Sequence, residues 1–427
     1  MIRILNMSEV SRDEIFARAE TITSVEDIVT GIIANVRGNG DAALREYCEK
    51  FDKVSLASFR VTPEEIEEAL TLVEPRLLEV LREAAKNIRA FHQKQVRQGF
   101  VMTEQDGVVL GQKITPIERV GLYVPGGTAA YPSTVLMDSI PALIAGCSRI
   151  VMVTPPGKDG KVNPAILASA HVAGITEIYK IGGAQAVAAL AYGTESIPKV
   201  DKIVGPGNAF VAEAKKQVFG MVSIDMIAGP SEILIVADKT ANPRYVAADL
   251  LSQAEHDKMA SAVLVTDDAA LAEAVAAEIE VQLAVLPRTE IARTSIETNG
   301  KIIVTADLDA AIDVANELAP EHLELAVDDP FKWLSAVKHA GSVFMGHNCP
   351  ESLGDYLAGP NHTLPTSGTA RFSSPLSVDD FVKKTQFSYF TRDALRRVAD
   401  DVHLFATKEG LDAHARAATI RFEEDEA

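Results

Sequence analysis

Hydrophobic and polar residues follow a helical spacing over most of the first 100 residues. The segments 25–36 and 41–51 are amphipathic, and Gly38 and Gly40 lie between them. Pro63 opens a longer run with glutamates near its start, where the helix dipole favours negative charge, and Pro75 is expected to break or kink that run. This part of the chain is therefore predicted to be mainly helical, with residues 1–21 as an N-terminal helical arm.

From Val120 onward, short β-branched runs alternate with alanine-rich helical stretches. The strands predicted are Val120–Val124, Ile150–Val153, Glu177–Ile181, Lys202–Val204, Glu232–Ala237, Ala262–Val265, Ile302–Thr305, Leu323–Val327 and Ser342–Met345. The helices predicted between them are Pro132–Ala145, Pro164–Val172, Gln185–Ala191, Ala209–Phe219, Pro243–Glu255 and Ala269–Leu286. Strands that alternate with helices in this way indicate right-handed βαβ units and parallel sheets.

The rhythm predicts an α/β protein with two Rossmann-like parallel-sheet domains, a helical N-terminal segment and a C-terminal tail. The first α/β domain is expected to comprise 22–122 and 233–376, and the second 123–232. A polar loop at 363–377 ends the rhythm, and a helical segment follows from Asp393. Residues 377–427 are therefore assigned to the tail.

Composition and charge exclude some classes of function. The chain has 427 residues, which is more than a single core usually supports, and a net charge of -19 without a lysine or arginine cluster. We therefore expect no nucleic-acid partner. Neither a secretory signal nor an apolar stretch long enough to span a bilayer is visible, so no membrane partner is expected. Three scattered cysteines fit neither a disulfide framework nor a cysteine-rich zinc site, and a cytoplasmic location is predicted.

Three predicted strands end in glycine-bearing loops. The loops are Val124-Pro125-Gly126-Gly127, Gly182-Gly183-Ala184-Gln185 and Gly205-Pro206-Gly207-Asn208. In open parallel sheets, ligands bind beyond the carboxyl ends of the strands, where glycine lets the backbone approach a phosphate. The loops favour a nucleotide or another phosphate-bearing ligand, although they could be tight turns only. None has the G-x-G-x-x-G pattern, so the spacing does not establish NAD.

Two sets of polar residues could carry chemistry. Gln253 and His256 lie three apart on a predicted helix and could bind a metal together with Asp355 and His414. Glu321 and His322 join a helix to a strand and could supply two different acid–base groups. Taken alone, each set is more readily interpreted as structural: a lone histidine on a helix usually is, and Glu321–His322 is more often a solvated glutamate and an ordinary histidine at a turn.

Aldehyde-oxidising enzymes can use a thiolate, so the cysteines were considered as nucleophiles. Cys147 follows a predicted helix, and Cys349 precedes Pro350 in a loop. Cys349 is less easily dismissed than Cys147, but structural roles are expected for both. The histidines at 92, 171, 339, 347 and 403 lack any chemical context and are also interpreted as structural.

Read together, these segments resemble the histidinol dehydrogenase family. The matching stretches are G-L-Y-V-P-G-G (121–127), K-I-G-G-A-Q-A (180–186), I-V-G-P-G-N (203–208), I-A-G-P-S-E (227–232), L-L-S-Q-A-E-H-D (250–257), A-P-E-H-L (319–323), G-S-V-F (341–344), G-D-Y-L-A-G-P-N-H-T-L-P-T (354–366) and S-G-T-A-R-F-S-S-P-L-S-V (367–378). They occur in the family's order and cover essentially the whole chain.

The resemblance implies a role for each matching position. One Zn²⁺ per subunit would be held by Gln253, His256, Asp355 and His414, and the catalytic groups would be Glu321 and His322. NAD contacts would fall on Tyr123, Gln185 and Asn208. Substrate contacts would fall on Ser231, Gln253, His256, Glu321, His322, Asp355, His362, Glu409 and His414. These roles place the metal and catalytic residues in the first α/β domain and the NAD loops in the second.

The resemblance further implies a homodimer with exchanged tails, in which Glu409 and His414 of one subunit complete the site of the other. The activity implied is oxidation of L-histidinol through L-histidinaldehyde to L-histidine. His322 would be the base in both oxidations and Glu321 would activate water, so that no thiol is needed. Three alternatives have the same broad features: a dehydrogenase for another small alcohol, a zinc hydrolase and a two-lobed binding protein. The first should lack His362 and Glu409, the second would not need the glycine loops, and the third would not need an acid–base set.

Overall fold

The computed structural model describes residues 1–18, 25–126 and 130–425, which form two compact units. The first unit comprises Met1–Gln95 and Ile117–Phe381, and the second comprises Val96–Pro116 and Val382–Ala427. Gly127 of the first glycine loop and the proposed 21/22 boundary lie outside the described residues. In the described part of the chain, no helix combines the length and apolar character needed to cross a bilayer.

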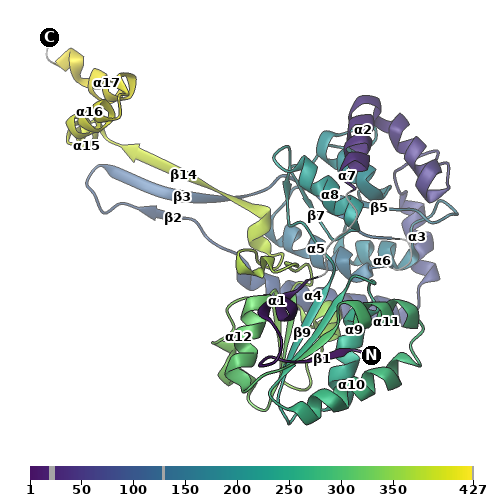
Figure 1. Cartoon of the computed structure of the whole chain (residues 1–427). Coiled ribbons are helices and arrows are strands. Elements are labelled where there is room, and N and C mark those ends of the chain that lie inside the picture. Colours follow the sequence, from purple (N-terminus) through teal and green to yellow (C-terminus); the bar gives the residue numbers. More distant parts are fainter. Residues whose placement is uncertain (19–24, 127–129, 426–427) are drawn as a thin grey trace. The chain divides into compact units, whose positions relative to one another are not determined.

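A five-stranded parallel sheet forms one half of the first unit (Figure 1). Its strands are β4 (Arg119–Tyr123), β5 (Arg149–Thr154), β6 (Ile178–Lys180), β7 (Lys202–Val204) and β8 (Ser223–Ile224), in the order β6-β5-β4-β7-β8. Helices α2 (Glu26–Tyr47), α7 (Gly183–Tyr192) and α8 (Ala209–Val218) pack on one face. Helices α3 (Pro63–Leu72), α4 (Pro75–His92), α5 (Pro132–Ala145) and α6 (Pro164–Ala173) pack on the other.

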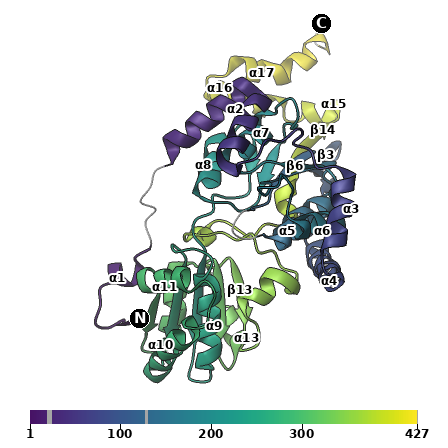
Figure 2. The ribbon, with the colours of Figure 1, turned by 90° about the vertical axis from the view of Figure 1, so that its right-hand side faces the viewer.

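A six-stranded parallel sheet forms the other half, in the order β1-β11-β10-β9-β12-β13. Its strands are β1 (Arg3–Asn6), β9 (Glu232–Ala237), β10 (Ser261–Thr266), β11 (Lys301–Val304), β12 (His322–Ala326) and β13 (Ser342–Met345). Helices α9 (Pro243–Ala254), α10 (Ala269–Leu283) and α11 (Thr289–Thr298) cover one face (Figure 2). Helices α1 (Arg12–Phe16), α12 (Leu308–Leu318) and α13 (Pro330–Leu334) cover the other.

The two sheets share one strand order. With the edge strand β1 set aside, the first strand of each sheet lies in the middle, the next two extend the sheet to one side, and the last two extend it to the other. This is the doubly wound arrangement of Rossmann-like folds, with β1 as an added edge strand beside β11. The prediction of an α/β protein with two parallel sheets is confirmed, and every predicted strand is present with its ends within one residue.

The second unit was not foreseen as a sheet. It contains the antiparallel strands β2 (Phe100–Met102), β3 (Val108–Pro116) and β14 (Val382–Phe390), in the order β14-β3-β2. Helices α15 (Arg392–Arg396), α16 (Ala399–Lys408) and α17 (Asp412–Thr419) follow β14. Strand β14 pairs with β3 over nine residues from far along the chain, a pairing that no local pattern indicates.

Shorter elements complete the fold. They are α14 (Glu351–Leu353), the π-helical turns Cys48–Asp52 and Gly354–Ala358, and the 3₁₀ turns Gln93–Gln95, Thr369–Arg371, Val378–Phe381 and Ile420–Asp425. Gly40 interrupts α2 with φ of 50°, and Pro75 separates α3 from α4, as their positions in the sequence predicted.

Two features differ from the sequence prediction. Arg3–Asn6, within the segment expected to be helical, forms strand β1, because four residues are too few to reveal a period and the partner β11 lies far along the chain. Helices α2–α4 pack on the five-stranded sheet, whereas the predicted range 22–122 grouped them with the six-stranded one. Helical periodicity identifies a buried face, but it does not identify the sheet that the face meets.

Candidate active site

A cluster of polar side chains lies between α9 and β12, in a layer that is otherwise apolar. On α9, Asp249 and Gln253 are four residues apart and so lie on one helix face. On β12, His322 and Glu324 point to the face opposite Leu323, because side chains alternate along a strand. Gln253, His322 and Glu324 are each at most 4% exposed. Buried polar groups of this kind require specific partners.

The backbone before β12 is shaped to present the two predicted catalytic residues. Ala319 ends α12 with φ of 45°, in the left-handed region that non-glycine residues rarely occupy. Pro320 and Glu321 then lead into β12, which begins at His322. The carbonyl of Glu321 accepts a hydrogen bond from Ser342 N at 2.9 Å. A Cβ at Gly341 would lie 2.4 Å from that carbonyl oxygen, which explains the glycine there.

His322 is held as a neutral imidazole. Its Nδ1 lies 2.9 Å from the carbonyl oxygen of Glu232, which can only accept, so Nδ1 carries the hydrogen. Nε2 has no hydrogen-bond partner among the described residues, although it is fully buried. Burial lowers the pKa of His322 to about 3. An unpartnered, unprotonated Nε2 is the state required of a general base.

Glu321 lies beside His322 but in a different electrostatic state. Its Oε2 is 3.6 Å from His322 Nδ1 and accepts a hydrogen bond from Glu232 N at 2.9 Å. Burial raises the pKa of Glu321 well above its usual value, and the Glu232 N–H opposes that shift. The negative charges of Glu232 and Asp355 raise it further. The adjacent pair therefore carries an imidazole that gives up its proton easily and a carboxyl that retains one.

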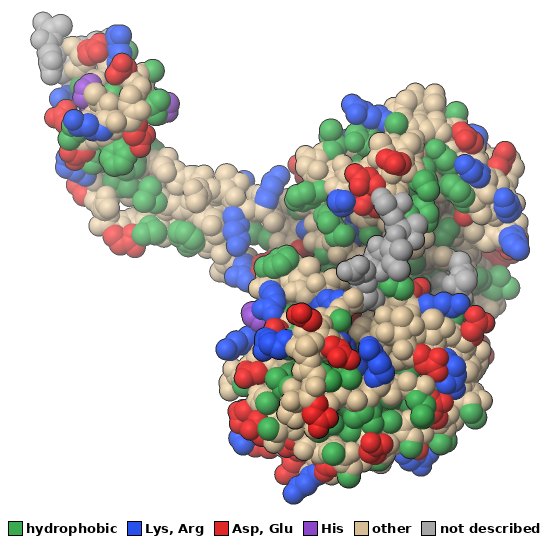
Figure 3. All heavy atoms as spheres, viewed as in Figure 1, with side chains coloured by type: hydrophobic (Ala, Val, Ile, Leu, Met, Phe, Trp, Pro, Cys, Tyr) green, Lys and Arg blue, Asp and Glu red, His purple; other side chains and the backbone are tan. Residues whose placement is uncertain are grey.

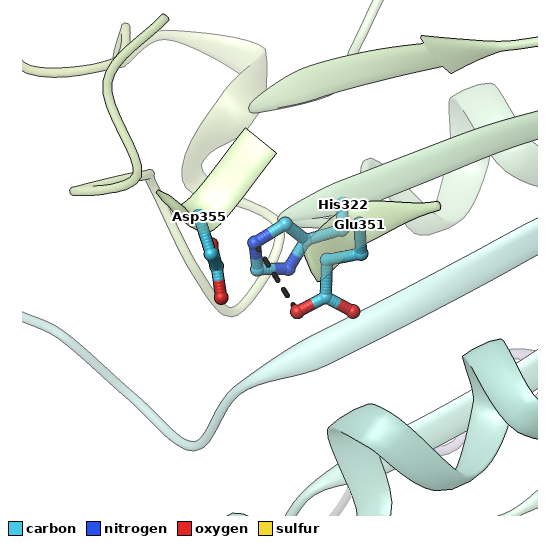
Figure 4. A group of neighbouring side chains, drawn as sticks. All are labelled: His322, Glu351 and Asp355. Carbon is cyan, nitrogen blue, oxygen red and sulfur yellow. Dashed lines mark ion pairs between the residues drawn. The ribbon is translucent and has the colours of Figure 1, made fainter. Parts of the chain in front are cut away.

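His322, Glu351 and Asp355 form a compact group (Figure 4). One ligand atom from each lies within 4.8 Å of the others, and His322 Nε2 is 3.8 Å from Glu351 Oε1. With its nitrogen turned toward Glu351, the amide of Gln253 donates to both carboxylate oxygens, at 2.7 Å to Oε2. Burial raises the pKa of Asp355 to about 6 and that of Glu351 well above its usual value.

Glu324 and Asp249 continue this acidic group along β12 and α9. Glu351 N donates to Glu324 Oε1 at 2.8 Å, and the side chains of Glu324 and Asp249 share a hydrogen bond. Burial raises the pKa of both carboxyls, to about 6 for Asp249. Several buried carboxyls in one place raise one another's pKa, and a bound cation would relieve that repulsion.

Other predicted site residues of the first unit lie near this group. His256 lies in a turn that follows α9, and its backbone N–H donates to Gln253 O at 3.1 Å. The helix ends at Ala254, one residue before the predicted end. His362 Nδ1 lies 3.9 Å from Asp355 Oδ1. Burial lowers the pKa of His256, and lowers that of His362 to about 4. Ser231 directly precedes β9, in line with Glu232.

His362 also connects to the helices of the five-stranded sheet. Its Nε2 lies 3.3 Å from Thr134 Oγ1 of α5. The neighbouring Asn361 donates to Met137 O at 2.6 Å, and Thr363 donates to Asp138 Oδ1 at 2.9 Å. One turn of α5 thus fixes the segment that carries His362.

The three glycine loops converge at the carboxyl edge of the five-stranded sheet. The hydroxyl of Tyr123, at the end of β4, accepts a hydrogen bond from Gly183 N at 3.0 Å, which joins the first loop to the second. A Cβ at Gly205 would lie 2.1 Å from Tyr123 O, so the third loop also passes close to β4. Gln185 is buried at the start of α7, whereas Asn208 is exposed and caps α8 through Phe210 N and Val211 N.

Glu409 and His414 belong to the second unit. Glu409 ends α16 and His414 lies on α17, and both side chains are exposed. The structure brings the other predicted metal ligands, Gln253, His256 and Asp355, into one unit. Of the predicted ligands, only Asp355 belongs to the compact group with His322 and Glu351.

The sequence prediction missed Glu351, Glu324, Asp249 and Glu232. A signal was present for two of them: Glu324 interrupts an apolar strand, and Asp249 interrupts the apolar face of a helix. A charge in such a position is seldom tolerated without a partner. Glu351 and Glu232 gave no comparable signal, because both lie at the ends of elements, where charges are common.

Comparison with known proteins decides the family. The sequence profile of histidinol dehydrogenase matches residues 16–422. The chain belongs to the histidinol dehydrogenase family. It is 59% identical over 403 residues to the histidinol dehydrogenase of Bacillus cereus, covering 94% of each chain. It is 55% identical over 415 residues to that of Listeria monocytogenes, covering 97% of each.

Similarity in structure extends over the same length. The crystal structure of histidinol dehydrogenase from Elizabethkingia anophelis matches with a TM-score of 0.94 at 40% sequence identity, covering 100% of this chain and 99% of that one. The resemblance drawn from the sequence motifs is therefore confirmed, and the chain has the histidinol dehydrogenase fold.

Proposed function

We propose that His322 and Glu321 supply the proton transfers that lead from L-histidinol to L-histidine, with NAD as the hydride acceptor. As a histidinol dehydrogenase, the chain is an oxidoreductase that converts histidinol to histidine in histidine biosynthesis. The observation that carries the assignment of roles is the environment of His322. Its Nδ1 is committed to the carbonyl of Glu232, and its buried Nε2 has no partner in the described part of the chain.

His322 is proposed as the base in both steps. Its Nε2 would accept the hydroxyl proton of histidinol while hydride leaves the same carbon for NAD, which gives the aldehyde. Once that proton has left for solvent, the hydrated aldehyde would lose its hydroxyl proton to the same atom while its hydride passes to a second NAD. Hydrogen bonding of Nδ1 to a fixed carbonyl keeps Nε2 in the accepting tautomer throughout.

Glu321 is proposed to activate water for the hydration between the two oxidations. A carboxylate with a raised pKa is a stronger base than a free one, so burial prepares Glu321 for this step. The N–H of Glu232 stabilises its ionised form. The Glu321 carboxylate and the neutral His322 imidazole thus offer two neighbouring proton acceptors for two different steps.

Zinc is proposed as the metal, with Gln253, His256 and Asp355 as ligands from this unit and His414 as the fourth. Amide, imidazole and carboxylate donors fit a borderline cation, and the buried carboxyls around Glu351 supply the negative charge that it would neutralise. When bound, one zinc ion per subunit would orient the substrate by its imidazole and amino nitrogens. Glu351 would then accept from Gln253 and stabilise the ligand orientation.

NAD is proposed to bind at the carboxyl edge of the five-stranded sheet, with Tyr123, Gln185 and Asn208 as contacts. The strand order reverses between β4 and β7, and open α/β sheets bind ligands in the crevice at that point. The loops after β4 and β7 are the ones that carry Gly126 and Gly205. Asn208 is exposed at the N-terminus of α8, where backbone N–H groups favour a phosphate.

The remaining assignments concern substrate, assembly and location. Ser231, His362 and Glu409 are proposed to contact L-histidinol, in addition to the metal and catalytic residues. Glu409 and His414 would come from the partner in a homodimer with exchanged tails, with residues 377–427 as the exchanged tail. We propose that residues 233–376 carry the metal and catalytic groups and residues 123–232 the NAD loops, and that the enzyme acts in the cytoplasm.

The proposed roles are tested by separating the two oxidations. His322→Asn removes the accepting nitrogen and is expected to lower the rate with L-histidinol and with L-histidinaldehyde by roughly 100-fold or more, within the range known for general bases. Glu321→Gln is expected to slow aldehyde oxidation at least 10-fold more than alcohol oxidation, because only the former needs water activated. NADH formation from each substrate measures both effects.

Equal losses in the two half-reactions of Glu321→Gln would contradict this division of labour. A matched control is Glu317→Gln on α12, an exposed carboxylate four residues earlier that pairs with Arg12 and is remote from the acid–base pair in its contacts. Glu317→Gln is expected to leave the rates with L-histidinol and with L-histidinaldehyde within about twofold of the wild-type rates, as is usual for a surface position.

A further inference from the structure

The backbone of one residue, Glu232, makes hydrogen bonds to both side chains of the acid–base pair, Glu321 and His322. Its N–H donates to Glu321 Oε2 at 2.9 Å, and its carbonyl accepts from His322 Nδ1 at 2.9 Å. Glu232 is also the first residue of β9, paired alongside β12. A displacement of Glu232 would therefore disturb both side chains at once. It would also break the hydrogen bond that keeps the proton of His322 on Nδ1.

The side chain of Glu232 is itself fixed by two other segments. Its Oε1 pairs with the guanidinium of Arg18, and its Oε2 accepts from Ser367 N at 3.2 Å. The carboxylate is only 14% exposed and the Arg18 side chain 32%, so this ion pair is partly shielded from water. A partly buried, hydrogen-bonded pair holds its geometry better than a surface pair does.

Arg18 contacts a second segment that leads to the acid–base pair. Its other terminal nitrogen donates to the carbonyl of Leu318, the last residue of α12 and three residues before Glu321. The guanidinium of Arg18 thus connects two segments that position the acid–base pair. One is the start of β9, where Glu232 contacts the pair, and the other is the end of α12, from which the chain continues to Glu321. A planar group with several donors in a fixed fork is suited to joining two acceptors in this way.

The N-terminal arm brings Arg18 to this place. Ile15 of α1 is buried in the core of the six-stranded sheet. The buried Lys301 donates to Ile15 O at 2.7 Å and to Ala17 O at 2.8 Å, which secures the chain directly before Arg18. The arm is therefore anchored independently of the Arg18–Glu232 pair.

From these contacts we infer that Arg18 is a positioning residue for the acid–base pair, acting through the side chain of Glu232 and the carbonyl of Leu318. The inference deepens the proposed function, since it rests on the roles given to Glu321 and His322. It assigns the N-terminal arm a part in catalysis, although no atom of the arm belongs to the acid–base pair.

The inference is tested with Arg18→Gln and Arg18→Ala, with Arg12→Gln as the matched control. Arg12 lies on the same arm and pairs with Glu317, so its loss weakens the arm without touching Glu232. Arg18→Gln is expected to lower kcat roughly 10- to 100-fold with both L-histidinol and L-histidinaldehyde, since small misplacements of reacting groups have effects of that size. The KM for NAD should be unchanged, and Arg12→Gln should retain kcat within about twofold.

Two further readouts separate positioning from folding. Guanidinium ion added to Arg18→Ala should restore a measurable part of kcat, because the vacated place is open to solvent on one side. The effects of Arg18→Gln and Glu232→Gln should not add in the double variant, because both break the same pair. Unchanged kcat in Arg18→Gln, additive effects, or equal losses in Arg12→Gln would overturn the inference. Failure of the wild-type protein to form NADH from histidinol would instead refute the proposed function.

Discussion

At the scale of single residues, burial shifts the pKa values of two neighbouring side chains in opposite directions, and the backbone of Glu232 holds both of them in place. His322 loses its proton readily because burial disfavours the charged imidazolium, although the hydrogen bond from Nδ1 to the Glu232 carbonyl opposes that shift. Glu321 retains one because burial and nearby carboxylates disfavour its charge. The sequence predicted both residues but not Glu232, because a main-chain contact from a residue about 90 positions away leaves no trace in the local pattern.

Asp138 offers a test of buried charge away from the acid–base pair. It is fully buried on α5, its Oδ1 accepts from Thr363, and its Oδ2 has no partner among the described residues. Burial, and then the charge of Asp225, raises its pKa to about 8 from 3.8. The folded state therefore binds this proton more tightly than the unfolded state does, so the stabilisation is complete below about pH 4 and is lost as the pH rises toward 8.

Asp138→Asn should consequently reduce the fall in Tm between pH 5 and pH 8, because the amide does not ionise. The measurement is a thermal scan at each pH, with Asp309→Asn, an exposed carboxylate on α12, as the control. A variant whose Tm falls with pH as steeply as that of the wild type would show that Asp138 is ionised in the folded protein.

At the scale of elements, the two sheets use opposite edges. The glycine loops follow the carboxyl ends of β4, β6 and β7, as the general rule for parallel sheets predicts. Glu232, His322 and Ser342 instead begin β9, β12 and β13, so the proposed acid–base pair lies at the amino edge of the six-stranded sheet. The sequence indicated the strands and the loops well, because both depend on local pattern. The amino-edge site could be found only from the motif A-P-E-H-L and its family.

The close approach of β13 to Glu321 yields a prediction for Gly341. A Cβ there would lie 2.4 Å from Glu321 O, so Gly341→Ala must push β13 away from the residue that precedes β12. We expect the free energy of unfolding to fall by about 1–3 kcal/mol, as overpacking usually costs, together with a loss of kcat. Denaturant unfolding and NADH formation measure the two effects.

Gly31→Ala provides the matched control for this substitution. Gly31 lies on α2, and a Cβ at that position would meet nothing within 4 Å. It should stabilise the protein by up to about 1 kcal/mol, the usual gain for alanine over glycine in a helix. If Gly341→Ala left stability and kcat as they are in Gly31→Ala, the proposed constraint on Glu321 would be wrong.

At the scale of the whole molecule, the second unit stands out by how little it buries. Its hydrophobic cluster consists of Ala399, Ala418 and Phe422, with Leu395 packed against it. Hydrophobic side chains lie on the surface of this unit (Figure 3), among them Phe100, Val101 and Met102 of β2 and Phe405 of α16. So small a core rarely stabilises a unit alone, which supports the proposed exchange of tails between two copies.

Tail exchange predicts that two inactive variants restore activity together. In co-expressed His322→Asn and His414→Asn chains, a mixed dimer would combine the intact body of one chain with the intact tail of the other. Random pairing should then yield about a quarter of the wild-type activity, from one intact site in each mixed dimer. Activity no higher than that of the two variants purified apart would mean that each tail serves its own chain.

Glu321 and His322 are proposed to support two successive oxidations of one histidinol by NAD, and the number of NADH formed per histidinol distinguishes two oxidations from one. Zinc-loaded protein would be incubated with limiting L-histidinol and excess NAD, and the NADH formed would be counted for each histidinol consumed. We expect two NADH, with L-histidine as the product. One NADH with free aldehyde would contradict the role of Glu321, and no NADH from folded dimer would contradict the proposed roles of both Glu321 and His322.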